Sequence, residues 1–168
     1  MLDRPTAVDP EVAELTFNEH LDELWRSGLP ATHGWGRIPL NKLHTVIVLW
    51  ADRGGAKEHY FIRLGGEYYD RWPPSVSFVE PSEWQPVKAN CRWWPAVNCP
   101  SWLGLHINHA LNGNPGQLIC FSFTAEYYMV DHNPGESAVW TPGVHTLSAT
   151  LCRLQEALSP PYYHGPSA

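Results

Sequence analysis

The sequence has no long hydrophobic run and little positive charge. Its longest apolar stretch runs from Val46 to Ala51, far short of the roughly 20 residues that span a bilayer, and no signal-peptide pattern opens the chain. Lys and Arg total 11 against 17 Asp and Glu, which gives a net charge of −6. No basic cluster is present to neutralise a phosphate backbone. We therefore expect a cytoplasmic protein with no membrane partner and no nucleic-acid partner.

The chain also has too few charged residues for a disordered protein. Charged residues make up 17% of it and hydrophobic residues 43%, a balance that favours a packed core. A length of 168 residues suits one domain, so we predict a single domain over 1–168 with its core at about 10–165. Without a secretory signal, the four cysteines are expected to stay reduced. Each is then a packing residue, a ligand or a nucleophile.

The sequence has a helix signal, then a run of strand signals and later a second helix signal, an order typical of the α+β class. Asp9 is followed by Pro and Glu, a helix-start signature, and apolar residues follow at helical spacing. This predicts a helix from about Pro10 to Ser27. Runs rich in β-branched and aromatic residues, separated by turn signals, predict the strands of an antiparallel meander. They lie at 43–50, 60–64 and 75–79.

The second half of the chain is predicted to hold a long irregular segment and one more helix. Residues 80–118 are rich in proline and lack a sustained period, so only a short extended piece is expected, at about 103–108. The tryptophans of this region are expected to pack it onto the sheet. From Thr141 onward, leucines at helical spacing predict a helix that ends before Ser159.

Several motifs occur in an order that resembles the ubiquitin-conjugating enzyme (UBC) family. An aromatic strand at 60–64 leads to the paired prolines Pro73-Pro74 that start the next strand. The segment 116–121 reads Gly-Gln-Leu-Ile-Cys-Phe, which is similar to the family's catalytic segment. The signature that opens the helix after the active site is similar to residues 140–142, Trp-Thr-Pro, and the proline-bearing loop that ends that helix is similar to 160–161.

This resemblance implies a UBC-like fold. Its parts are an N-terminal helix, a four-stranded antiparallel meander sheet, an active-site flap and then one long helix, without the family's last two helices. The stretches between Phe78 and His106 and between Cys120 and Trp140 are longer than in the family. The chain resembles the divergent conjugating enzymes of bacterial ubiquitin-like pathways more than the typical eukaryotic form.

The resemblance also implies an acyl transferase that works through a covalent intermediate. Such an enzyme accepts a ubiquitin-like protein from an activating enzyme as a thioester, here on Cys120, and passes it to an amine of a target protein, usually a lysine. The activating enzyme uses the ATP, so the chain itself needs no cofactor. The implied partners are the ubiquitin-like protein, the activating enzyme and the target, with a ligase or a deconjugating protease as further candidates.

Two stretches are candidates for the family's His-Pro-Asn motif. His106-Ile107-Asn108 keeps the order of the motif, whereas Asn112 has the usual spacing before the cysteine. An Asn amide aimed at the reacting carbonyl would stabilise its oxyanion by roughly 3 kcal/mol. We favour Asn108 for that role and place Asn112 second.

The incoming amine must also lose a proton. His164 stands about where the family has an acidic residue, and a neutral imidazole can accept a proton near pH 7. Asp131 and His132, in the longer stretch after Cys120, are alternative helpers.

The same residues also fit other functions. The chain is alternatively an inactive UBC-like module that binds a modifier or its enzymes without a covalent bond, although such variants normally lack the cysteine. A thiol hydrolase would use Cys120 with a histidine as base, the candidates being His106, His109 and His132.

A third alternative is a zinc-stabilised interaction domain. Its ligands would be Cys91, Cys99, His106 and His109, whose spacings match none of the compact pairs typical of structural zinc. The alternative to all of these functions is that Cys120 is an unreactive core thiol. Cys152 is expected to be a core residue of the last helix.

Overall fold

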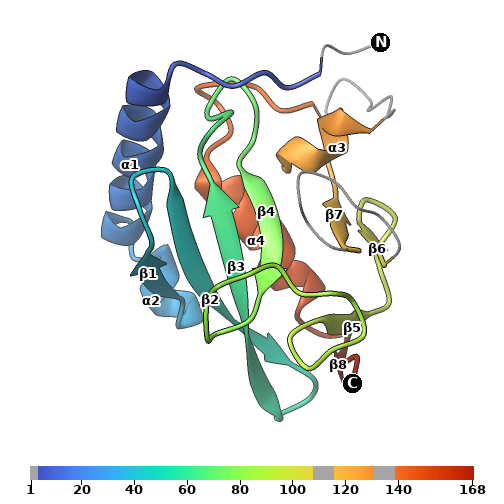
Figure 1. The fold of residues 1–168 in the computed structure, drawn as a ribbon. Helices are drawn as coiled ribbons and strands as arrows, with labels where there is room; N and C mark the ends of the chain where they lie inside the picture. Colours follow the sequence, from blue (N-terminus) through green and yellow to red (C-terminus); the bar gives the residue numbers. More distant parts are fainter. Residues whose placement is uncertain (1–3, 108–115, 131–138) are drawn as a thin grey trace.

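A four-stranded antiparallel sheet organises the computed structural model, which describes residues 4–107, 116–130 and 139–168. The strands follow one another in sequence order across the sheet (Figure 1), and all their pairings are antiparallel. The α+β class and the four-stranded meander predicted from the sequence are therefore confirmed. The strands are β1 (Gly36–Pro39), β2 (His44–Asp52), β3 (Lys57–Gly65) and β4 (Ser75–Val79).

The hairpin between β2 and β3 positions the centre of the sheet. Its turn contains Gly54 and Gly55, both with positive φ, and the Asp52 carboxylate accepts a hydrogen bond from the Gly55 N–H at 2.9 Å. Glycine adopts these left-handed conformations without the strain that a side chain brings. Alternate residues of the two strands, such as Ile47 and Ile62, point into the main core and are fully buried.

Helix α1 (Pro10–Arg26) lies beside the sheet and closely matches its predicted bounds. The Asp9 carboxylate caps it by accepting hydrogen bonds from the N–H groups of Glu11 and Val12, which satisfies donors that a helix start leaves unpaired. A short helix, α2 (Leu29–His33), follows and was not predicted.

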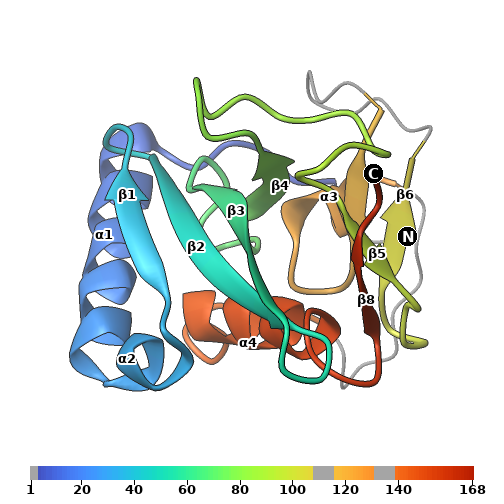
Figure 2. The same ribbon diagram turned by 90° about the horizontal axis from the view of Figure 1, so that it is seen from below.

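Helix α4 (Leu147–Ala157) crosses one face of the sheet (Figure 2) and buries its leucines there. It begins six residues later than the Thr141 start that the sequence predicted. The reason is local, since the N–H groups of Val144 and His145 both bond to the Thr141 carbonyl and form a turn.

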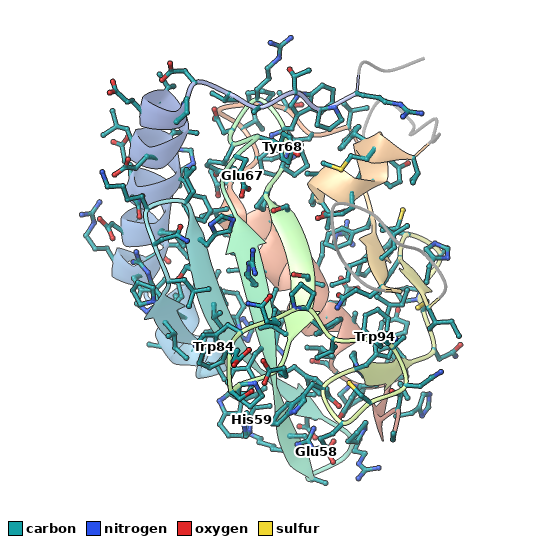
Figure 3. All side chains as sticks on the ribbon, viewed as in Figure 1. Glu58, His59, Glu67, Tyr68, Trp84 and Trp94 are labelled. Atoms are coloured by element: carbon teal, nitrogen blue, oxygen red, sulfur yellow. The ribbon has the colours of Figure 1, made fainter. Side chains whose placement is uncertain are left out.

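The opposite face of the sheet is covered by an irregular segment, residues 80–93, which crosses it (Figures 1 and 2). Trp84, labelled in Figure 3, and Trp93 pack there against the outward-facing Val46, Phe61 and Val79. This confirms that tryptophans pack the long segment onto the sheet.

Two small antiparallel pairs stand beside β4, on the side away from α1 (Figure 2). One joins β5 (Pro95–Val97) to β8 (Tyr163–Pro166), and the other joins β6 (Gly104–His106) to β7 (Leu118–Cys120). The predicted extended piece at 103–108 is thus confirmed as β6. The predictions that the rest of 80–118 is irregular and that the chain after α4 is a loop are wrong at β5 and β8.

Strand β8 was missed because its partner lies far away in the sequence. The Tyr163 hydroxyl bonds to the Tyr60 hydroxyl at 2.6 Å and also to the Glu58 carboxylate, which holds the segment against β3. Of the helices in the described ranges, none is long and apolar enough to cross a membrane.

Candidate functional site

Cys120 is the last residue of β7, in the two-stranded ribbon that β7 forms with β6. It lies directly opposite Gly104, and His106 lies opposite Leu118. Directly opposed residues of antiparallel strands project to the same face, and so do residues two apart on one strand. Cys120 and His106 therefore lie on one face of the ribbon.

The His106 ring leans over Gly104. A Cβ atom added to Gly104 would lie 2.7 Å from Nε2 of His106, so the imidazole occupies the space that a side chain at position 104 would fill. That space is opposite Cys120 across the ribbon. The structure thus brings together two of the residues that the sequence predicted for the site.

The thiol of Cys120 is buried, with only 4% of the residue exposed. Burial raises the pKa of the thiol to about 12, and the carboxyl of Glu126 adds to the effect. The sulfur is therefore protonated at neutral pH, and a nearby base is needed to make it a nucleophile. The titratable side chain that the structure describes on the same face of the ribbon is His106.

Glu126 anchors the short helix α3 (Ala125–Met129), which follows β7 and was not predicted. Both of its carboxylate oxygens accept from the backbone N–H of Val76, at 3.1 and 3.2 Å. Burial raises the pKa of this fully buried carboxyl to about 8. Sequence reasoning missed this residue, and the available signal was one acidic residue within the largely apolar segment 118–130.

Gln117 anchors β7 from its other end and was also missed. Its side chain accepts from the N–H of Phe78 at 3.0 Å and donates to the carbonyl oxygens of Phe78 and Val87, at 2.9 and 2.6 Å. The amide group thus joins β4 to the covering segment and holds β7 beside them. No feature of the sequence distinguishes this glutamine from an exposed one.

Trp140 secures the chain after α3. Its ring N–H donates to the Asp70 carbonyl at 2.7 Å, and its backbone N–H donates to the Tyr128 hydroxyl at 2.9 Å. The Tyr128 hydroxyl donates in turn to the Ser122 carbonyl. The Trp-Thr-Pro segment is therefore tied to the residues directly after Cys120.

The remaining predicted site residues are not assembled around Cys120 by the described chain. His164 is exposed on β8, the partner of β5 rather than β7, and its carbonyl accepts from Arg53. The other predicted polar residues lie outside the described residues: Asn108, His109, Asn112, Asp131 and His132.

Within residues 4–107, 116–130 and 139–168, no group of three or more His, Cys, Asp or Glu side chains is arranged to hold a metal ion. Of the proposed zinc ligands, Cys91 is half-buried and Cys99 is exposed, its thiol donating to the Val97 carbonyl. The expectation that Cys152 is a core residue is wrong, because its side chain projects from the exposed side of α4.

Neither a protein-family model nor a curated protein matches this chain.

Proposed function

We propose that this chain carries a ubiquitin-like protein as a thioester on Cys120 and transfers it to an amine of a target protein. The observation that carries the proposal is the placement of Cys120 and His106 on one face of the β6–β7 ribbon. The order of elements supports it, because a helix, a four-stranded meander, a cysteine-bearing strand and a further helix follow one another as the resemblance to the UBC family implies.

In the first step the Cys120 sulfur attacks the thioester that joins the modifier to the activating enzyme. His106 accepts the thiol proton, the new sulfur–carbon bond forms, and the bond to the activating enzyme's sulfur breaks. The departing sulfur leaves as a thiolate and takes up a proton. Exchange between two thioesters is close to neutral in free energy, so the cysteine needs a proton acceptor rather than a permanently ionised sulfur.

In the second step an amine attacks the thioester carbonyl. The amine loses a proton, an amide bond forms and the sulfur–carbon bond to Cys120 breaks. Asn108, with Asn112 second, is the proposed donor to the oxyanion. Asp131 or His132, rather than His164 on β8, is the proposed acceptor of the amine proton.

A second candidate function is noncovalent binding of a ubiquitin-like protein by an inactive UBC-like domain. The burial of the Cys120 thiol favours it, since a sulfur that is 4% exposed must be uncovered before it meets a second protein. In this alternative the cysteine is a core residue and His106 has no chemical role.

The two functions are separated by trapping the covalent intermediate. Tagged protein is purified from its native cells with ATP present and analysed on nonreducing gels and by intact mass, for wild type, Cys120→Ser and Cys120→Ala. The carrier function predicts an adduct that thiols release in the wild type, an adduct that resists thiols in Cys120→Ser, and none in Cys120→Ala.

Cys152→Ser is the matched control, because this exposed cysteine lies outside the ribbon. It should leave the adduct unchanged. If the activating enzyme is charged and the wild type still forms no adduct, the carrier function is wrong and noncovalent binding is favoured.

A further inference from the structure

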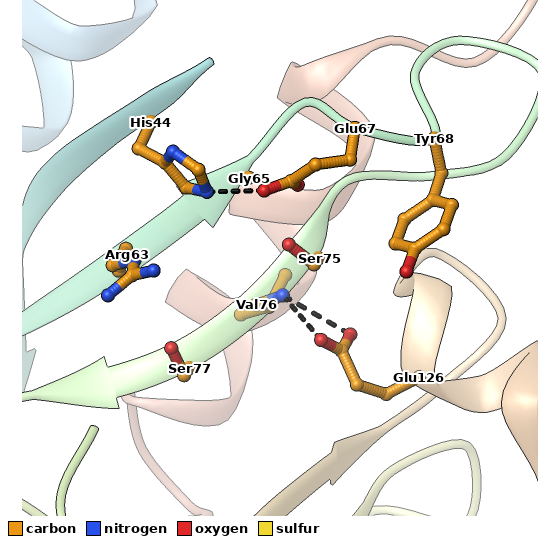
Figure 4. A pocket seen from close by; sticks show the side chains of 9 residues that line it. All are labelled: His44, Arg63, Gly65, Glu67, Tyr68, Ser75, Val76, Ser77 and Glu126. Atoms are coloured by element: carbon orange, nitrogen blue, oxygen red, sulfur yellow. Dashed lines mark hydrogen bonds and ion pairs between the residues drawn. The ribbon is translucent and has the colours of Figure 1, made fainter. Parts of the chain in front are cut away.

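A polar cavity of about 160 Å³ lies at the end of the sheet where β3 finishes and β4 begins (Figure 4). It is on the same face of the sheet as Trp84 and Trp93, beyond the part that these side chains cover, as the strand register shows. Glu67 and Tyr68, which directly follow β3 and are labelled in Figure 3, are among the residues that line it.

The cavity exists because Gly65, Ser75 and Ser77 are small and leave space between the larger side chains around them. One row across the strands is His44, Gly65 and Ser75, and the next contains Arg63 and Ser77. A Cβ atom at Gly65 would collide with Oγ of Ser75 and Oε2 of Glu67. Only glycine therefore leaves room for the Glu67 carboxylate to reach into the hollow.

Glu67 makes one side of the cavity negative. One of its carboxylate oxygens pairs with Nε2 of His44. Burial acts to raise the pKa of this carboxyl, but the His44 bond and the charges of His44 and Arg63 outweigh it and hold the pKa below its usual range. The other oxygen, Oε2, is buried and has no hydrogen-bond partner in the part of the chain that the structure describes.

Arg63 makes another side of the cavity positive. Its guanidinium lies away from Glu126 in Figure 4, beside Ser77 in the neighbouring strand. Within the described ranges no hydrogen bond or ion pair engages it, although its charge acts on Glu67. Among the residues that the structure describes, the half-buried Arg63 guanidinium and the buried Oε2 of Glu67 therefore both lack a direct partner in this cavity.

We propose that this cavity binds a free α-amino acid. Its ammonium group would bind Oε2 of Glu67 and the Ser75 hydroxyl, and its carboxylate would bind the Arg63 guanidinium and the Ser77 hydroxyl. Charge-assisted bonds of both kinds are stronger than neutral ones. A simple amine would leave the positive charge of Arg63 unpaired and be repelled by it. A simple carboxylate would be repelled by Glu67 in the same way. A zwitterion pairs with both charged groups.

The size of the hollow agrees with a small ligand, because pockets for drug-sized molecules start at about 300 Å³. The site does not include Cys120 or His106. Its test is therefore independent of the thioester chemistry.

The proposal is tested by calorimetric titration of the full chain with each of the twenty amino acids at millimolar concentration. For the amino acid that binds best, the matched amine and the matched carboxylate are titrated as well; for alanine these are ethylamine and propionate. We expect each half-ligand to bind at least about tenfold more weakly than the amino acid, since each loses one charge-assisted pair.

Two variants identify the site. Glu67→Gln and Arg63→Gln each remove one charge, and each should weaken amino-acid binding by at least about tenfold. Arg26→Gln, at the exposed end of α1, is the control and should bind like the wild type. Circular dichroism checks that every variant is folded.

Each charge variant tests the site separately, so the test can be made even if only one of the two variants folds. The proposal is overturned if no amino acid binds, if a half-ligand binds as tightly as the amino acid, or if a folded charge variant binds like the wild type.

Discussion

At the scale of single residues, Cys120 combines a strand-end position with a sulfur that the fold covers. Its thiol is 4% exposed, whereas the side chains of Cys99 and Cys152 are exposed. Accessibility and thiolate fraction together set the rate at which a cysteine reacts. The resting protein should therefore protect the proposed nucleophile and leave the thiols of Cys99 and Cys152 open to reagents.

We predict that iodoacetamide at pH 8 modifies Cys120 at least about 100-fold more slowly than Cys152, because the raised pKa of about 12 leaves little thiolate. Peptide mapping by mass spectrometry over a time course measures both rates in one sample. Equal rates would show that the thiol is neither buried nor protonated in solution.

His106 is predicted to act as the base that the protonated thiol needs. His106→Gln should slow thioester formation at pH 7 by about 100-fold, the range expected for loss of a general base. Because a base matters less when hydroxide is abundant, the deficit should shrink as the pH rises. A deficit that is the same at every pH would mean that His106 only shapes the ribbon.

Glu126 predicts a pH-dependent stability. Its folded-state pKa, raised to about 8, lies above the usual carboxyl value, so its contribution is present below pH 4 and is lost as the pH rises toward 8. Glu126→Gln, which keeps an acceptor for Val76, should remove that loss. The wild type should lose up to about 4 kcal/mol more than the variant between pH 5 and pH 8.5.

Urea unfolding of the two proteins at both pH values measures the effect. Parallel losses in wild type and Glu126→Gln would contradict the assignment of a buried, proton-binding carboxyl. Glu11→Gln, at the exposed start of α1, is the control and should follow the wild type.

At the scale of elements, the strands and helices with a local signal were predictable. The β-branched and aromatic runs predicted the hairpin and β4, and Asp9 with Pro10 marked the start of α1. Strands β5 and β8 were not predictable, because three-residue and four-residue strands have no period of their own. They form where distant side chains, such as Tyr60 and Tyr163, meet.

The attachment of β7 to the rest of the fold depends on the buried amide of Gln117. We predict that Gln117→Met, which keeps the length of the side chain, lowers the free energy of unfolding by about 3 kcal/mol. It leaves the N–H of Phe78 and two carbonyl oxygens without their partner. Chemical denaturation measures the loss.

Gln85→Met is the matched control for that variant, since Gln85 is exposed and its side-chain amide donates to the carbonyl of nearby Glu83. A change of similar size in both variants would mean that the Gln117 network has no special role.

At the scale of the whole molecule, the packing of α4 against the sheet closes the main core. Leu151 is fully buried, with 0% of its surface accessible, whereas its neighbour Cys152 is exposed to solvent. Leu151→Ala should lower the free energy of unfolding by about 3 kcal/mol, and Cys152→Ala should change it by less than about 0.5 kcal/mol. Thermal and urea unfolding of the two variants test whether Leu151 is a core residue and Cys152 is a surface residue.

The candidate site was predictable only in part. The motif order singled out Cys120 and His106, and the ribbon places them on one face. The residues that position the ribbon, Gln117 and Glu126, were not predictable, because their roles arise from hydrogen bonds to backbone groups some 40 to 50 residues away. Burial of the Cys120 thiol was also not predictable, because it depends on how the folded chain packs around the sulfur.

The proposed carrier function depends most on whether Cys120 bears the modifier. The direct measurement is peptide mapping of the ATP-dependent adduct, with the attachment site read by mass spectrometry in the wild type and in Cys120→Ser. We predict a thioester on Cys120 in the wild type and an oxygen ester at the same position in the variant. A modifier attached to Cys91, Cys99, Cys152 or a lysine, with Cys120 unmodified, would contradict the account.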